Sequence, residues 1–262
     1  MAQHEPRTDG GHGGVAIRPA ASLLVIRQSV GELEVLLLKR ADSMRFLPGF
    51  LSFPGGSLDE EDYLLADSAT GAPLASALPE DVAFAVAAIR ECAEETGLVL
   101  SLTNGTVETA APSPGSRPEV SSPVALSPEL QASLLTHQTG FGEVLQRQQW
   151  RVDASRLRFV GRWITPPNMP ARFDTRFFLT VIQPGAVAIR VNPAESQWGR
   201  WCTPRSVLTG IDEGRAKAAP PTVAMLQALA TFAGAEDCFR HLNVPGPKPE
   251  ELIELAEKLN RL

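Results

Sequence analysis

Three glutamates stand close together in the stretch Arg90-Glu91-Cys92-Ala93-Glu94-Glu95-Thr96-Gly97-Leu98. On a helix, residues three and four positions apart share a face, so Glu91, Glu94 and Glu95 would point the same way. Like charges at that spacing repel each other and destabilise a helix. Hard carboxylate oxygens suit Mg²⁺ or Mn²⁺, and a bound cation would offset the repulsion. The spacing predicts a divalent metal site, with a solvated acidic helix face as the alternative.

A helix that begins near Pro79 and ends before Gly97 would carry these glutamates. Proline suits the first helical turn, and the acids Glu80 and Asp81 complement the helix dipole there. Glycine suits the position just past the last turn. Arg90, on the same helix, would pair with one of the carboxylates and fix its orientation.

The rest of the chain alternates apolar, β-branched runs with helical patterns and turn residues. We expect strands at 20–26, 33–39, 158–164, 177–183, 187–191 and 200–202, and helices at 128–137, 141–150, 223–232 and 249–262. Strands with a few interposed helices indicate an α/β domain with a mixed sheet.

Composition shifts divide the chain into three parts. A polar, glycine-rich start predicts a disordered tail over 1–19. The main domain is expected over 20–215, with a surface insertion at about 63–78 and a long loop at about 102–127. A helical extension over 216–262 is expected to pack on the same domain.

Charge and cysteine usage exclude some classes of protein. The formal net charge of −6 argues against nucleic acid or an anionic membrane as the main partner, but not against a small phosphorylated substrate. Three widely spaced cysteines without a CxxC pair indicate reduced thiols, and no apolar run is long enough for a membrane span. We therefore expect a cytoplasmic location and leave open whether the chain forms a homodimer.

The acidic stretch resembles the end of the Nudix box, whose pattern is G-x5-E-x7-R-E-U-x-E-E-x-G-U with U aliphatic. It matches at every specified position, with Cys92 at the first U, where we expect buried packing. The head of the box is Gly56, followed six positions later by Asp62 where the family has Glu. Asp62 and Arg90 are separated by 27 residues instead of seven, so the box is split by an insertion of about twenty.

The split box also resembles one branch of the family, the coenzyme A diphosphatases that include a mammalian peroxisomal member. Met44-Arg45-Phe46-Leu47-Pro48-Gly49 and Phe53-Pro54-Gly55-Gly56 support this resemblance. A related coenzyme A signature, L-L-T-x2-S-x2-L-R-x-H-x-G-Q-V-x2-P-G-G, has the same length as 36–56. It matches there in part, and departs where this chain has Leu38, Ala41, Leu47 and Phe50.

The resemblance implies a Nudix α/β/α sandwich and a hydrolase that needs Mg²⁺ or Mn²⁺. The implied substrate is coenzyme A or an acyl-coenzyme A, cleaved at the pyrophosphate to a phosphopantetheine and adenosine 3′,5′-bisphosphate. One alternative is a diphosphatase for another nucleoside diphosphate derivative, such as ADP-ribose or NADH. The other is a Nudix-like module that binds a nucleotide without cleaving it.

The resemblance also implies roles for single residues. Glu91, Glu94 and Glu95 would hold the metal, and Arg90 would act with Glu91 and Glu94 in catalysis. The base that takes the proton from water would be a box glutamate or Glu195, in a later loop. An alternative for Glu195 is a loop acid that orients a strand.

Substrate contacts are expected from Arg45, Gly55 and Gly56, with a surface salt bridge as the alternative for Arg45. Other side chains in the resembling segments are expected to be structural. Arg172 and Asp174 are expected to form a buried ion pair that orders a loop. The aromatic residues Trp163, Phe173 and Phe177 are expected in the core rather than in a platform for adenine.

Overall fold

A mixed β-sheet forms the centre of the molecule. The computed structural model describes residues 15–76, 78–104, 122–167, 169–183, 188–247 and 251. The seven-stranded sheet has the order β11-β2-β1-β10-β9, with β3 and β4 paired to β2 and β1. Its strands are β1 (Ile17–Ser29), β2 (Glu32–Arg40), β3 (Leu51–Ser52), β4 (Gly55–Ser57), β9 (Arg158–Ile164), β10 (Arg172–Ile182) and β11 (Ser196–Cys202). β1 and β10 are parallel and the other pairs are antiparallel, which confirms the expected mixed sheet.

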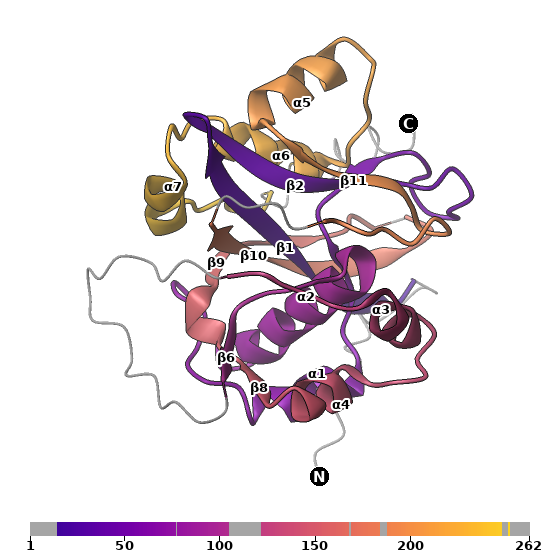
Figure 1. The fold of residues 1–262 in the computed structure, drawn as a ribbon. Coiled ribbons are helices and arrows are strands. Elements are labelled where there is room, and N and C mark those ends of the chain that lie inside the picture. Colours follow the sequence, from indigo (N-terminus) through magenta and orange to yellow (C-terminus); the bar gives the residue numbers. More distant parts are fainter. Residues whose placement is uncertain are drawn as a thin grey trace.

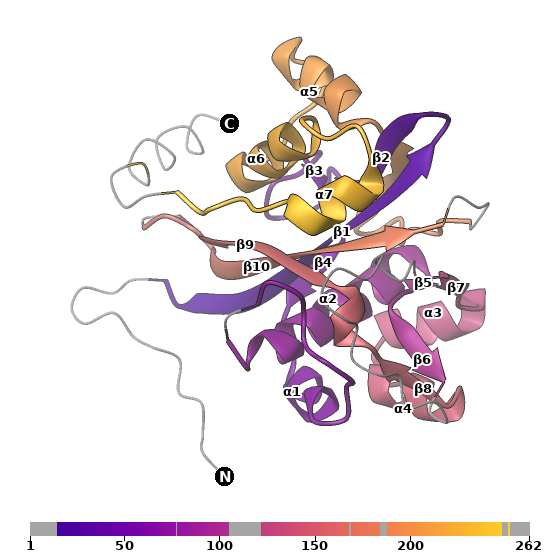
Figure 2. The same ribbon diagram turned by 90° about the vertical axis from the view of Figure 1, so that its left-hand side faces the viewer.

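Helices cover both faces of this sheet (Figure 1, Figure 2). One layer contains α1 (Glu60–Ala66), α2 (Asp81–Thr96), α3 (Pro128–Leu135) and α4 (Phe141–Arg147). The other contains α5 (Pro204–Asp212), α6 (Pro220–Leu229) and α7 (Ala235–His241). Along β1, Leu23 and Val25 belong to the core under α2, whereas Leu24 and Ile26 belong to the core under α6. The middle of β1, from Leu23 to Ile26, is continuously apolar because both of its faces are buried there.

Small residues let α2 lie close to the sheet. Ala85, Ala87 and Ala88 are fully buried along its length. The helix ends at Gly97, which has the left-handed φ of 73° that glycine adopts without steric cost. At its other end, Asp81 pairs with the buried Arg176 of β10. The helix is therefore fixed to the sheet along its length, and its glutamates have a rigid base.

The expected surface insertion at 63–78 is attached to the fold. Its first residues complete α1, a helix that the sequence analysis missed. The peptide groups of Thr70 exchange hydrogen bonds with those of Val152 and Ala154, and Leu74 pairs likewise with Leu157 and Phe159. The segment is at the surface but is not a free excursion.

Two small sheets and a short 3-10 helix complete the described fold. β5 (Leu98–Val99) pairs with β7 (Val124–Ala125), and β6 (Leu102–Asn104) pairs with β8 (Trp150–Val152). The ends of the expected loop at 102–127 thus contain β6 and β7, while 105–121 lie outside the described residues. The 3-10 helix spans Ala154–Arg156.

Several expected boundaries were wrong. β1 begins at Ile17, inside the expected tail of 1–19, and 1–14 lie outside the described residues. No strand forms at the described residues 188–191, and α5 and α7 were not expected. Of the expected helix at 249–262, only Glu251 is described. None of the described helices is both long and apolar enough to span a membrane.

Candidate active site

The C-terminal half of α2 presents the three glutamates on one partly buried face. Glu91 and Glu94 have side chains that are only 15% and 12% exposed. Glu95 is half-buried and accepts a hydrogen bond from the backbone N–H of Gly55, at 2.9 Å. The helical arrangement inferred from the spacing is therefore present, and the alternative of a fully solvated acidic face does not fit this burial.

Arg90 joins the two halves of the split box. Its Nε and Nη2 donate to the two carboxylate oxygens of Asp62, at 3.0 and 2.9 Å. Its Nη1 donates to Glu91 at 3.1 Å and to Glu94 at 3.2 Å, and Nη2 also reaches the carbonyl of Ser57 at 2.9 Å. Arg90 and Asp62 are both buried, so this bidentate pair fixes α1 against α2 and orients two of the three glutamates.

Gly55 and Gly56 bring β4 against the same face of α2. A Cβ on Gly56 would lie 2.5 Å from the carboxyl carbon of Glu91, well inside van der Waals contact. A Cβ on Gly55 would overlap the carbonyl oxygen of Ala21 and lie 2.8 Å from the Cα of Ser22. The absence of side chains at these two glycines is what allows the strand and the glutamates to approach.

Burial makes negative charge costly at these glutamates. It raises the pKa of Glu91 to about 8, against the opposing effect of the Arg90 charge. Burial and the neighbouring charge of Glu91 raise the pKa of Glu95 well above its usual range. Burial also raises the pKa of Glu94, with Arg90 again opposing. All three groups would be stabilised in their charged form by a cation.

The donor chemistry fits a divalent cation shared with a substrate. Among the described residues, no group of three His, Cys, Asp or Glu side chains is arranged so that it could hold a metal ion by itself. Mg²⁺ is usually held by one or two carboxylates together with substrate phosphates rather than by a cage made only of protein. Clustered carboxylates on one helix face, with raised pKa values, match that kind of open site.

Glu195 and Arg40 approach the glutamates from other elements. Glu195 precedes β11, and its carbonyl accepts the N–H of Ala41 at 2.8 Å. The charge of Glu195 further raises the pKa of Glu95, whereas the charge of Arg40 lowers it. Arg40, the last residue of β2, was missed by the sequence analysis because the pairing of β2 with β11, which sets Arg40 opposite Ser196, is what places it beside Glu195.

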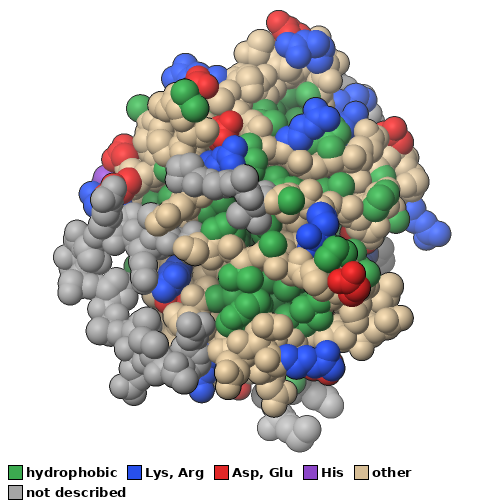
Figure 3. All heavy atoms as spheres, in the orientation of Figure 1, with side chains coloured by type: hydrophobic (Ala, Val, Ile, Leu, Met, Phe, Trp, Pro, Cys, Tyr) green, Lys and Arg blue, Asp and Glu red, His purple; other side chains and the backbone are tan. Residues whose placement is uncertain are grey.

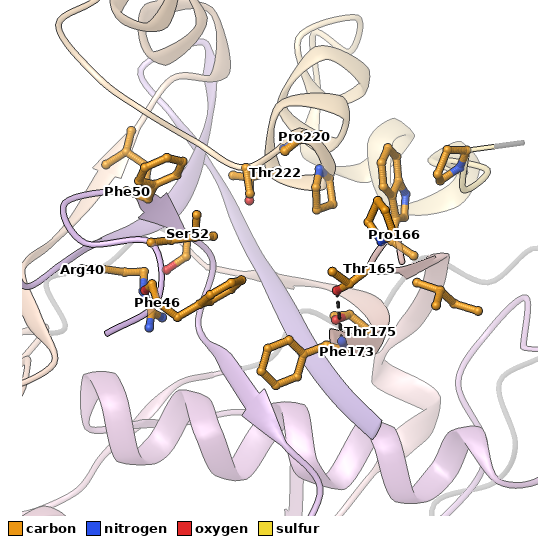
Figure 4. A pocket seen from close by; sticks show the side chains of 17 residues that line it. Arg40, Phe46, Phe50, Ser52, Thr165, Pro166, Phe173, Thr175, Pro220 and Thr222 are labelled. Atoms are coloured by element: carbon orange, nitrogen blue, oxygen red, sulfur yellow. Dashed lines mark hydrogen bonds between the residues drawn. The ribbon is translucent and has the colours of Figure 1, made fainter. Parts of the chain in front are cut away.

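An open cleft with an empty volume of about 870 Å³ lies between β3, β9, β10 and the start of α6 (Figure 4). Arg40 is the charged side chain in its wall. The other lining residues are Phe46, Leu47, Phe50, Leu51, Ser52, Trp163, Ile164, Thr165, Pro166, Phe173, Thr175, Ala219, Pro220, Pro221, Thr222 and Pro247. Arg40 thus belongs to the cleft wall and also acts electrostatically on Glu95.

Some residues expected to be structural, or to bind substrate, lie elsewhere than expected. Asp174 pairs with Arg162, at 2.5 Å, so the expected Arg172–Asp174 ion pair is wrong. Phe177 is in the core as expected, but Trp163 and Phe173 line the cleft.

Arg45 is exposed on the loop between β2 and β3, and it is not among the residues that line the cleft. Its expected contact with substrate stays a prediction. On the face seen in Figure 3, Lys and Arg side chains are scattered among acidic ones rather than gathered into one basic surface.

A mixed sheet between two helical layers, with a carboxylate-bearing helix held against a Pro-Gly-Gly strand, defines a Nudix hydrolase. Comparison with known proteins agrees. A family model described as the NUDT19 Nudix domain matches residues 64–229. A solved Nudix hydrolase from Alicyclobacillus acidocaldarius superposes with a TM-score of 0.78 at 38% identity, over 89% of this chain and 99% of that one. The chain therefore belongs to the family of the NUDT19 Nudix domain, and it is a pyrophosphohydrolase.

Curated relatives extend the similarity along most of the chain. A nudix hydrolase of Caenorhabditis elegans is 28% identical over 243 residues, which cover 92% of this chain and 70% of that protein. The acyl-coenzyme A diphosphatase NUDT19 of Gallus gallus is 26% identical over 266 residues, covering 85% and 70%. The resemblance to the coenzyme A diphosphatase branch is thus confirmed at the level of the family.

Proposed function

We propose that this protein is a metal-dependent hydrolase that cleaves the pyrophosphate bond of coenzyme A or an acyl-coenzyme A. The products would be a phosphopantetheine, acylated where the substrate is, and adenosine 3′,5′-bisphosphate. The observation that carries the hydrolytic part is the assembled set of Arg90, Asp62 and the three glutamates. Similarity to proteins named acyl-coenzyme A diphosphatase supports the choice of substrate.

Glu91, Glu94 and Glu95 would hold one or more Mg²⁺ or Mn²⁺ ions, which supply neutralising charge at the pyrophosphate and a more acidic bound water. Arg90 keeps Glu91 and Glu94 in place from its buried pairing with Asp62. In the reaction, a water oxygen forms a bond to one phosphorus while the bridging P–O bond breaks. A carboxylate takes the proton of that water.

Two carboxylates are candidates for that base. Glu95 is held by the N–H of Gly55, and its raised pKa brings it nearer to neutral pH, which suits a general base. Glu195 faces the same group from the loop before β11. Separate Gln substitutions at the two positions, followed by pH–rate profiles, would assign the role to the one whose removal abolishes the acidic limb.

The decisive experiment is a hydrolysis screen with product identification by mass spectrometry. Coenzyme A, octanoyl-coenzyme A, ADP-ribose and NADH would be tested with Mg²⁺, with Mn²⁺ and with a chelator. We expect adenosine 3′,5′-bisphosphate from the coenzyme A substrates, and only with metal. A higher kcat/KM for ADP-ribose or NADH would overturn the substrate assignment, and binding without turnover would point to a nucleotide-binding module.

The variant Glu95→Gln tests the carboxylate set itself. Gln keeps the shape and the acceptor for the Gly55 N–H but loses the charge, so we expect kcat to fall at least about a hundredfold. Thermal stability without metal should hold or rise, because the substitution relieves repulsion with Glu91. Near-normal turnover at saturating Mg²⁺ would remove Glu95 from the site.

A further inference from the structure

The cleft beside α6 has a largely uncharged wall, although the proposed substrate is highly charged. Arg40 is the charged side chain among its lining residues, and its charge also acts on Glu95. Phe46 and Phe173 face each other in the cleft with ring centroids 5.9 Å apart. Beyond this aromatic pair the described wall is uncharged, so it suits a neutral, largely apolar group.

The neutral polar side chains of the cleft wall are the hydroxyls of Ser52, Thr165, Thr175 and Thr222, and Thr165 already accepts the N–H of Phe173. Pro166, Pro220, Pro221 and Pro247 also contribute to the wall, and proline has no backbone N–H to donate. A base edge is recognised by several hydrogen bonds in one plane, whereas an acyl chain requires only apolar contact. The wall therefore favours the acyl chain.

Trp163 lines the cleft, but its indole nitrogen lies behind the wall with almost no exposed surface. The indole Nε1 makes no hydrogen bond to any described residue. Trp163 therefore contributes ring carbons to the cleft wall rather than a hydrogen-bond donor.

From this charge distribution and this largely apolar wall we propose that the cleft binds the acyl-pantetheine end of an acyl-coenzyme A. The pyrophosphate would lie at the glutamates, Arg40 would mark the passage between the two regions, and the adenosine bisphosphate would lie outside the cleft. The enzyme would then select substrates by their acyl group. This inference rests on the proposed function and adds to it a site that recognises the acyl chain.

A substitution that fills the cleft tests the proposal. Ala219 lines the cleft at the start of α6 and is partly exposed, so Ala219→Phe adds a ring to the cleft without overpacking the core. Gln227→Phe adds the same ring on the exposed side of the same helix and is the matched control. We expect Ala219→Phe to lower kcat/KM for octanoyl-coenzyme A at least about tenfold, and to lower that for coenzyme A, which lacks the acyl chain, by a smaller factor.

Binding of the two product halves gives a readout independent of turnover. Calorimetry would compare octanoyl-phosphopantetheine with adenosine 3′,5′-bisphosphate on the wild type, Ala219→Phe and Gln227→Phe. We expect only Ala219→Phe to weaken binding, by at least about tenfold, and only for the octanoyl ligand.

The outcomes separate the two proposals. Weaker binding of adenosine 3′,5′-bisphosphate to Ala219→Phe, with the octanoyl ligand unaffected, would assign the cleft to adenine and overturn the inference. Equal losses for both ligands would overturn it as well. If the wild type cleaves no coenzyme A substrate but Ala219→Phe still weakens only octanoyl-phosphopantetheine, the proposed function fails and the acyl site stands.

Discussion

Gly56→Ala should impair catalysis far more than folding. The new Cβ would lie 2.5 Å from the carboxyl carbon of Glu91, and ordinary contact begins at 3.4 Å, so the carboxylate must retreat by 0.9 Å. Glu91 is a flexible side chain and can move. Glu91 Oε1 is the atom that accepts from Arg90 Nη1 at 3.1 Å, so a displacement of this size should lengthen or break that hydrogen bond.

The size of each effect follows from that movement. Losing one charge-assisted hydrogen bond costs about 1.5–3 kcal/mol, and restricting the unfolded chain by Gly→Ala returns about 0.4–1 kcal/mol. Arg90 keeps Asp62 and Glu94 as partners, so the melting temperature should fall by less than about 8 °C. A carboxylate displaced by nearly 1 Å should lower kcat/KM by roughly a hundredfold.

Gly55→Ala is the contrasting variant. Its Cβ meets the backbone of Ala21 and Ser22 in β1, which cannot retreat as a side chain does. We expect a loss of about 3 kcal/mol or more in the free energy of unfolding. Urea unfolding and initial rates on coenzyme A would be measured for both variants. The reasoning is refuted if Gly56→Ala is as unstable as Gly55→Ala, or if it keeps full activity.

Two further predictions concern Arg90 and pH. Arg90→Met removes the ion-pair partner of the buried Asp62 carboxylate, so the free energy of unfolding should fall by about 3–5 kcal/mol. Adding Asp62→Asn removes the buried charge and should restore part of that free energy. A double variant no more stable than Arg90→Met would contradict this. Without metal, the pKa of Glu91 is about 8 in the folded protein and near 4.5 in the unfolded chain, so the folded state binds the extra proton. Stability should therefore fall as pH rises from about 4.5 to about 8, and Mg²⁺ should reduce that slope; a chelator-treated sample whose melting temperature rises over this range would refute the assignment.

The carboxylate face of α2 was predictable because it depends only on local spacing. Glu91, Glu94 and Glu95 lie three and four residues apart, and any helix through them brings them together. The partnership of Arg90 with Asp62 spans 28 positions and was not predicted, because the resemblance assigned both residues to one motif without saying that they pair. Sequence patterns therefore predicted the arrangement within one helix, but not the contacts between segments that are distant in the chain.

The misassigned ion pair shows the same limit. Arg172 and Asp174 are two residues apart on β10, so their side chains share a face of the strand and the spacing favours an ion pair between them. In the structure, Asp174 lies opposite Ile164 of β9, and Arg162 is two residues from that position on the same face. The register between two strands decides which arginine is within reach, and no local pattern in either strand specifies that register.

The cleft was not predicted for a related reason. Its wall combines the loop after β2, the ends of β9 and β10, and the start of α6, which are far apart in the sequence. Trp163 and Phe173 were assigned to the core because aromatic residues are usually buried there. Phe173 instead lines the open cleft, and Trp163 both packs against the core and lines the cleft, so residue type alone did not indicate their role.

The two halves of the split Nudix box lie together in the structure, and the contacts of the insertion explain why. α1 presents Asp62 to Arg90, and Glu61 of the same helix accepts the N–H groups of Phe141 and Gly142 at the start of α4. These contacts fix α1 to both α2 and α4, and farther along the insertion the backbone of Thr70 pairs with that of Val152. A long loop between catalytic halves costs little entropy by itself, but it leaves them free to separate. Here each half is fixed by buried charge or by backbone pairing, so Asp62 has a fixed position relative to Arg90. The glutamates that accept hydrogen bonds from Arg90 are therefore held in fixed positions as well.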